Sequence, residues 1–147
     1  MKVLTTALFA LLFAVPSWSV LGEPERSVAT DQQRLRGELR SETRQGYTVH
    51  EITAADGMKV KEYVAPAGMV FGVSWTGPVM PDLQNLLGAY FPEFQKSAEN
   101  APAPRRRALA VRTDRLVVES AGHMRAFHGR AYVPSLVPAQ VTEEVVQ

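Results

Sequence analysis

His50 and Glu62 are the two residues whose types could together carry acid/base chemistry. They lie in the runs YTVHEIT (residues 47–53) and MKVKEYV (residues 58–64), whose β-branched and aromatic residues predict strands. An imidazole that faces a carboxylate on an apolar surface is how a general base is oriented. The alternative is that the two side chains only satisfy one another at the edge of the core. We favour this alternative, because no serine, cysteine or glycine-rich elbow accompanies the pair.

The turn between the two runs decides whether His50 faces Glu62. A two-residue turn would place Glu51 opposite Glu62, so that two like charges meet. A three-residue loop with Gly57 in the left-handed conformation instead pairs Glu51 with Lys61 and His50 with Glu62. We therefore expect the three-residue loop.

The same pairing, continued across the turn at residues 65–68, predicts a third strand at residues 69–75. This register places Glu62 opposite Phe71 and Val60 opposite Val73. One face of the meander then collects the apolar side chains Ile52, Met58, Val60, Val64, Met69, Phe71, Val73 and Trp75, together with His50 and Glu62.

The rest of the chain predicts helices and a second meander. Asp82 precedes apolar residues at spacings of three and four, which predict an amphipathic helix bent at Pro92. A weaker helix, with Ser27 as its cap, is expected over residues 23–38. The second meander is predicted as strands at residues 108–111, 116–119 and 123–127, with a turn at residues 120–122. We therefore expect an α+β fold of two antiparallel three-stranded β-meanders with a central amphipathic helix and a short N-terminal helix.

Residues 1–19, MKVLTTALFALLFAVPSWS, have the order of a secretory signal peptide. Lys2 supplies the charged start, an apolar run over residues 3–15 follows, and the small residues Ser17 and Ser19 form a cleavage site. The apolar run is too short for the roughly 20 residues of a membrane-spanning helix. We expect cleavage after Ser19 and a periplasmic or secreted protein.

The expected mature chain is one domain with no transmembrane segment. Cleavage after Gly22 is an alternative, because glycine is also small. We expect a single α+β domain over residues 20–134 and an irregular surface tail over residues 135–147. The chain has no cysteine, so disulfides are excluded.

Charge and histidine spacing exclude several classes of partner. The chain has 16 basic and 15 acidic residues, and the leader contains only the basic Lys2, so the mature formal charge is 15 minus 15, or zero. We therefore expect no nucleic-acid partner. The arginine run at residues 105–107 is interpreted as a solvated linker. His123 and His128 are five apart, which on one strand places them on opposite faces, so we expect no metal site and no cofactor.

The remaining candidates are binding residues rather than catalytic ones. They are Tyr63, His123, Arg125, Phe127, His128 and Arg130. The leading hypothesis is an exported, non-enzymatic binding or accessory protein of the cell envelope, which uses the solvent side of the sheet or the segment from His123 to Tyr132 to bind an envelope protein partner. One alternative is an acid/base hydrolytic enzyme organised around His50 and Glu62. Another is a structural or assembly component of an envelope complex.

Several stretches of the mature chain resemble a known family. The most specific are PDLQNLLGAYF (residues 81–91) and GHMRAFHGRAYVP (residues 122–134), and LGEPERSVATDQQRL (residues 21–35) also fits. The chain is similar to an uncharacterised family of exported proteobacterial proteins, domain-of-unknown-function family 2844. The resemblance implies an envelope or secreted location and supplies no activity, cofactor or catalytic residue. Lys61 stands where the family is expected to have arginine, and both side chains are cationic.

Overall fold

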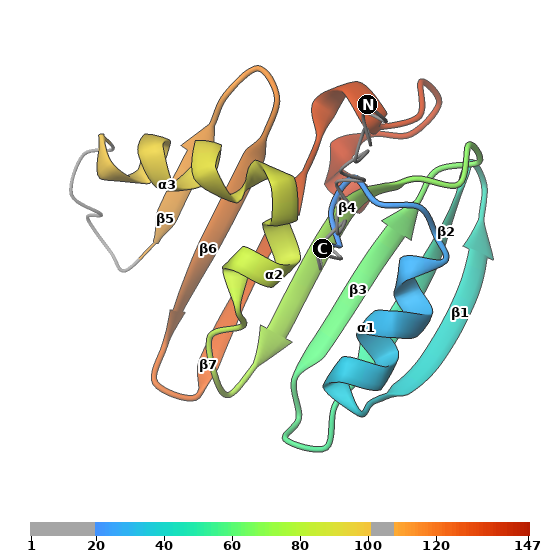
Figure 1. Ribbon diagram of the computed structural model, residues 1–147, viewed down its shortest axis with the longest axis horizontal. Coiled ribbons are helices and arrows are strands. Elements are labelled where there is room, and N and C mark those ends of the chain that lie inside the picture. Colours follow the sequence, from blue (N-terminus) through green and yellow to red (C-terminus); the bar gives the residue numbers. More distant parts are fainter. Residues whose placement is uncertain (1–19, 101–107) are drawn as a thin grey trace, which may run out of the picture.

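One antiparallel sheet of seven strands forms the centre of the protein (Figure 1). The computed structural model describes residues 20–100 and 108–147. The strands are β1 (Glu38–Arg44), β2 (Tyr47–Thr53), β3 (Lys59–Val64), β4 (Val70–Gly77), β5 (Leu109–Arg112), β6 (Val117–His123) and β7 (Ala126–Tyr132). Their order across the sheet is β1-β2-β3-β4-β7-β6-β5. The α+β class is confirmed, but the two expected three-stranded meanders are joined into one sheet, because β4 pairs with β7.

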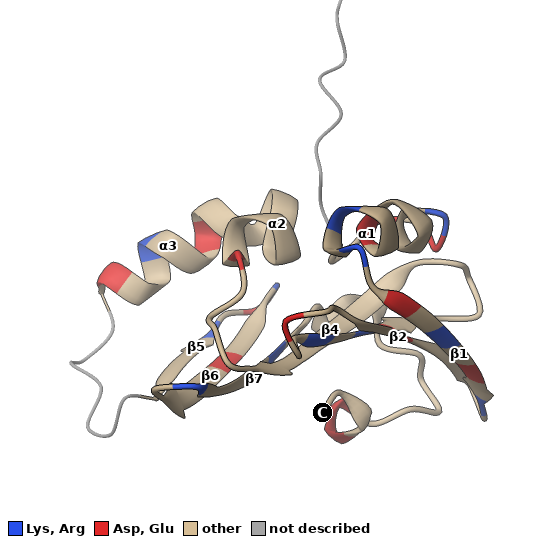
Figure 2. Cartoon of the chain, turned by 90° about the horizontal axis from the view of Figure 1, so that it is seen from below, with Lys and Arg blue, Asp and Glu red and all other residues tan. Residues whose placement is uncertain are grey.

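Helices cover one face of the sheet and the C-terminal segment packs on the other (Figure 2). The helices are α1 (Ser27–Leu35), α2 (Leu83–Leu87), the 3-10 turn η1 (Gly88–Tyr90) and α3 (Phe91–Glu99). The C-terminal segment contains the 3-10 turns η2 (Pro134–Leu136) and η3 (Glu143–Val145). We call the two sides the helix face and the tail face, and residues 134–147 the tail. Each face has its own cluster of buried apolar side chains.

The register of the β2–β3 hairpin is confirmed. His50 pairs with Glu62 and Glu51 with Lys61, and Gly57 has a φ of 88°. The strand β1 beside it was not predicted. All seven residues of β1 are exposed, so β1 lacks the apolar alternation by which a strand is recognised.

The predicted register between β3 and β4 is wrong. Glu62 pairs with Val73, and the pairing shifts between Tyr63 and Val64, which leaves Phe71 as an extra residue in β4. Such a bulge turns the following side chains to the opposite face. Phe71 consequently packs with Tyr63 on the tail face instead of the helix face.

The predicted turn between β6 and β7 is also wrong. Val118 pairs with Ala131, and β6 continues through Gly122 to a turn at Met124 and Arg125. Arg125 adopts a φ of 65° there, a conformation that two-residue hairpins favour and that glycine or asparagine usually supplies. The sequence Met-Arg gives no signal for this turn.

The expected helix from Asp82 is split into two. Asp82 does cap it, because its carboxylate accepts a hydrogen bond from the backbone N–H of Asn85 at 3.2 Å. The chain breaks at Gly88, and Pro92 lies in the first turn of α3, where proline is tolerated. At the N-terminus, Ser27 makes no capping hydrogen bond.

The tail was expected to be irregular chain on the surface, but part of it packs into the tail face of the sheet. Val146 is fully buried between Tyr63, Phe71, Val117 and Tyr132 on the tail face. The expected leader, residues 1–19, and the arginine run, residues 105–107, lie outside the described residues.

Candidate functional site

A row of polar side chains crosses the helix face beneath α1. Register places Ser41 of β1, His50 of β2 and Glu62 of β3 side by side. The helix covers this row with Val28 and Asp31, which are both buried. The predicted His50 and Glu62 neighbours are therefore found together, under a helix rather than in an open cleft.

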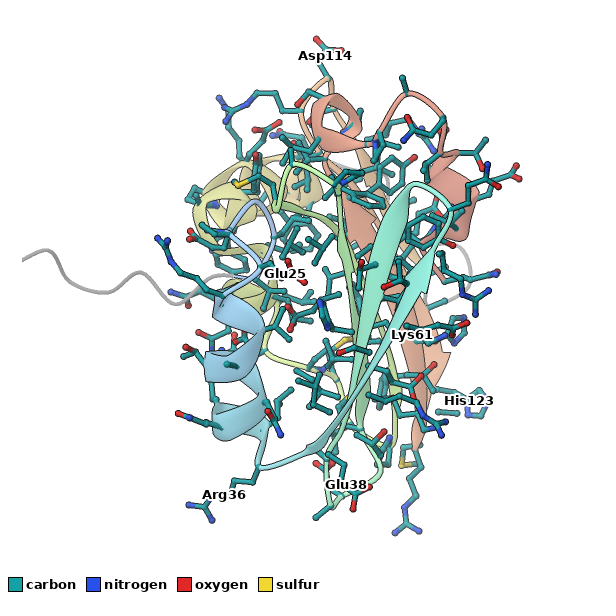
Figure 3. The ribbon with its side chains drawn as sticks, turned by 90° about the vertical axis from the view of Figure 1, so that its right-hand side faces the viewer. Glu25, Arg36, Glu38, Lys61, Asp114 and His123 are labelled. Atoms are coloured by element: carbon teal, nitrogen blue, oxygen red, sulfur yellow. The ribbon has the colours of Figure 1, made fainter. Side chains whose placement is uncertain are left out.

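His50 is held by residues other than Glu62. Its Nδ1 lies 2.7 Å from Ser41 Oγ and its Nε2 lies 2.8 Å from Glu25 Oε1. Figure 3 shows Glu25 near the end of α1, on the side that faces the sheet. Both ring nitrogens of His50 are thus engaged, and the residue is only 8% exposed.

Glu62 is a buried carboxyl group without a hydrogen-bond partner among the described residues. The pKa of Glu62 is raised to about 8, mainly by burial and also by the nearby Asp31, while Arg34 acts in the opposite direction. Asp31 is also buried, and burial raises the pKa of Asp31 to about 6 although Arg34 Nη2 lies 3.0 Å from its Oδ1. Glu62 is therefore mainly protonated at neutral pH.

This arrangement attaches α1 to the sheet. A general base must reach the proton that it removes, and neither nitrogen of His50 is free to do so. Glu25, Asp31 and Arg34 were missed by sequence reasoning. The spacing of three between Val28 and Asp31 places both on one face of α1, which is the signal that could have indicated a buried carboxylate.

Replacing His50 with glutamine should lower stability without a specific functional loss. Glutamine cannot keep both contacts of the imidazole, to Ser41 and to Glu25, so about 1 kcal/mol of unfolding free energy is expected to be lost. Thermal melting measures this loss, and quantitative blotting gives the cellular abundance. A phenotype much larger than the fall in abundance would contradict the structural role.

Tyr63 was expected as an exposed aromatic residue, and it is buried on the tail face at 2% exposure. Its hydroxyl donates to the carbonyl oxygen of Gln147 at 2.6 Å and accepts from the Gln147 N–H at 3.0 Å. Lys61 Nζ also donates to that carbonyl oxygen, at 3.1 Å. Tyr63 therefore anchors the tail instead of presenting a surface to a partner.

A groove of about 600 Å³ lies on the tail face beside the tail. Its floor is one row of paired residues, Leu109, Ser120, Gly129 and Trp75. Gly129 has no side chain, and the side chains of the other three point to the helix face. The flanking rows are rich in small side chains: Ala110, Glu119 and Arg130 on one side, and Ala108, Ala121, His128 and Thr76 on the other. We call this the tail-face groove. It crosses β4, β7 and β6 and ends at the sheet edge formed by β5.

Fixed polar groups lie along one wall of the tail-face groove. Arg130 Nε donates to Glu119 Oε2 at 2.8 Å, and the Arg130 guanidinium lies 5.8 Å from the ring centre of Tyr132. Arg130 also reaches the carbonyl oxygen of Val146 at 3.4 Å. Two predicted binding residues, His128 and Arg130, therefore line one groove.

Comparison with known proteins identifies a family. A family model described as protein of unknown function (DUF2844) matches residues 17–146. The chain belongs to the DUF2844 family. No curated protein and no solved structure matches it.

The other predicted binding residues of this DUF2844 chain lie outside the tail-face groove, near the β6–β7 turn. His123 and Arg125 are exposed, and Phe127 is half-buried. Arg125, Phe127 and His128 line a smaller hollow with Pro78. His128 lines both this hollow and the tail-face groove, so the two adjoin along β7.

His123 and His128 do not lie on one strand, contrary to the expectation from their spacing. His123 and His128 lie on neighbouring strands, because the turn at residues 124–125 intervenes, and His128 pairs with Ala121. Within residues 20–100 and 108–147, no group of three histidine, aspartate or glutamate side chains could hold a metal ion.

Proposed function

We propose that this chain is an exported, non-enzymatic binding or accessory protein of the cell envelope, and that the tail-face groove is its binding site. The observation that carries the proposal is the groove itself. It is open and mostly apolar, several of its lining side chains are small, and it lies beside the tail, whose Gln147 forms part of its lining. The Arg130–Glu119 pair and His128 supply polar groups that could orient a partner.

The order of residues 1–19 supports export. The described helices include none that is long and apolar enough to cross a membrane. We propose cleavage after Ser19 and a periplasmic or secreted mature protein. An envelope protein is the partner that this location would supply.

The two alternative functions receive less support. Acid/base catalysis would require access to His50, which is covered by α1 and engaged at both nitrogens. An assembly role for the tail would require a free tail, whereas Val146 is buried against the sheet. The tail-face groove needs no rearrangement to receive a partner.

Filling the tail-face groove should abolish partner capture. Ala121 lies on its wall, and an arginine there would occupy the space between the flanking rows. The matched control is Ala29→Arg, because Ala29 is exposed on α1 and far from the tail face. We expect tagged wild type and the Ala29→Arg variant to recover the same envelope protein, and Ala121→Arg to recover at least about tenfold less.

The capture experiment is done by mild extraction of the native envelope and mass spectrometry. Equal recovery by Ala121→Arg and wild type would show that the groove is not the binding site. Recovery of the wild type as a lone monomer would contradict the proposed function as a whole.

A further inference from the structure

The strand β1 is an uncovered edge of the sheet. It pairs with β2 on one side, and no described element lies beyond it in Figure 1. All seven residues of β1 are exposed, and all seven pair with β2 in one unbroken register. Short length, a proline or a bulge commonly blocks such an edge, and β1 has none of these. Its outward N–H and C=O groups are therefore available to a further strand.

The charges on β1 alternate in sign along one face of the strand. Its sequence is ELRSETR, and Figure 2 shows the acidic and basic residues alternating along it. Every second residue is charged, and register places these residues on the tail face, in the rows that contain Tyr47, Val49 and Lys61. They are Glu38, Arg40, Glu42 and Arg44. Their charges sum to zero, so the strand as a whole favours neither a cationic nor an anionic partner.

The order of these charges selects one antiparallel pairing of β1 with a second copy of itself. Let Ser41 lie opposite Ser41 of the second copy. Glu38 then faces Arg44, Arg40 faces Glu42, and the twofold symmetry repeats both pairs. Centring the pairing on Arg40 or on Glu42 would instead place arginine opposite arginine and glutamate opposite glutamate. The alternation therefore favours the centred register and opposes its two neighbours.

These side chains have few competing partners within one molecule. Glu38 and Arg40 form no ion pair within residues 20–100 and 108–147. Arg44 Nη2 lies 2.8 Å from Glu42 Oε2 on the same strand, and both side chains are more than half exposed. Such an exposed pair contributes little and can exchange for a pair across an interface. On β2, register places one charged residue opposite these four, Glu51 opposite Arg40.

We propose that two copies of the mature chain associate through β1, so that one antiparallel sheet runs across both molecules. Backbone hydrogen bonds supply the attraction, and the four cross-strand charge pairs set the register and the choice of partner. The twofold axis is perpendicular to the sheet, so both tail-face grooves lie on the same face, toward the outer edges at β5. Each copy contributes a single strand, so we expect a weak dimer that dissociates in the dilute solutions used for unfolding measurements.

Analytical ultracentrifugation over a range of protein concentrations tests this association with two variants. Glu38→Arg with Glu42→Arg gives β1 four positive charges, and Arg40→Glu with Arg44→Glu gives it four negative charges. Each variant alone should dimerise at least about tenfold more weakly than the wild type, because like charges then face each other. An equimolar mixture of the two should restore the dimer, with one chain of each kind.

The matched control is Arg26→Glu with Lys96→Glu, which changes the net charge as much as Arg40→Glu with Arg44→Glu does. Both control residues are exposed and lie at or within helices, away from β1. The control alone should dimerise like the wild type. Mixed with the positive β1 variant, it has the same net charges as the restoring mixture, yet it should form no mixed dimer.

Circular dichroism confirms that each variant is folded. A wild type that stays monomeric at every concentration would overturn the proposal, as would one-sign variants that dimerise like the wild type. Equal association in the control mixture and in the mixture of β1 variants would also overturn it. Ala121→Arg in the tail-face groove should dimerise normally, because β1 forms the opposite edge of the sheet. The outcome is therefore separate from that of the partner capture experiment.

Discussion

Replacing Glu62 with glutamine is expected to raise the free energy of unfolding by a few kcal/mol at about pH 9 and to change it little at about pH 5. The carboxyl group of Glu62 is fully buried and has no hydrogen-bond partner among the described residues. An ionised carboxylate in that position is costly, whereas a neutral carboxyl or amide group is tolerated.

The sign of this effect follows from the direction of the pKa shift. Burial raises the pKa of Glu62 from 4.5 to about 8, so the folded protein holds a proton that the unfolded chain releases. The stability that this proton supplies is complete below pH 4.5 and is lost as the pH rises through about 8. At about 1.4 kcal/mol per pKa unit, the loss is on the order of 5 kcal/mol. Glutamine does not titrate, so the variant does not lose this unfolding free energy as the pH rises.

Urea unfolding at several pH values measures the difference. Burial raises the pKa of Asp31 from 3.8 to about 6. The stability that protonated Asp31 contributes is therefore lost as the pH rises from about 3.8 to about 6. A series from about pH 6.5 upward therefore isolates Glu62. Glu42→Gln, on the exposed strand β1, is the control and should follow the wild type. Parallel curves for Glu62→Gln and wild type would contradict a protonated, buried Glu62.

Replacing Val146 with aspartate is expected to undock the tail and cost about 2–4 kcal/mol. Val146 is fully buried in an apolar cluster that includes Phe71 and Tyr132. An ionised side chain cannot remain there, so the tail must leave and uncover this aromatic surface. Melting temperature and binding of an apolar dye report the two consequences. Thr142→Asp, in an exposed part of the tail, should change neither, and equal behaviour of the two variants would contradict the account.

A double-mutant cycle tests the same contact through the backbone. A Cβ at Gly72 would lie 2.7 Å from Val146 Cγ2, so Gly72→Ala should destabilise the protein by displacing the tail. Val146→Ala removes the clashing methyl groups. The double variant should therefore be more stable than the sum of the two single effects allows. Simple additivity would indicate that Gly72 serves some other purpose.

The register of the β2–β3 hairpin could be predicted because it depends on residues close together in the sequence. Glu51 and Lys61 attract when they pair and Glu51 and Glu62 repel, so charge alone selects the three-residue loop. The apolar spacing after Asp82 similarly predicted a helix over the sheet. These signals depend on neighbours in the chain or across a single turn.

The errors occur where distant parts of the chain decide the structure. The bulge at Phe71 makes room for an aromatic cluster with Tyr47 and Tyr63, and the tail completes that cluster. The strand β1 forms an edge of the sheet, and all seven of its residues, including Leu39, are exposed. No local sequence pattern distinguishes the bulged strand β4 from a regular strand, or the polar strand β1 from a loop.

The candidate site shows the same division. Register predicted that His50 faces Glu62, and it does. The partners that settle its chemistry, Glu25 and Asp31, come from α1 and its approach, whose position depends on tertiary packing. The tail-face groove likewise arises from strands of both halves of the chain, because β4 and β7 pair.

Site-specific photo-crosslinking in the native envelope tests the proposed binding role most directly. A photoreactive residue is placed at position 121 in the tail-face groove, and at position 29 on α1 for comparison. The proposed function predicts one discrete adduct with an envelope protein from position 121 and none from position 29. No adduct from position 121, or the same adducts from both positions, would contradict it.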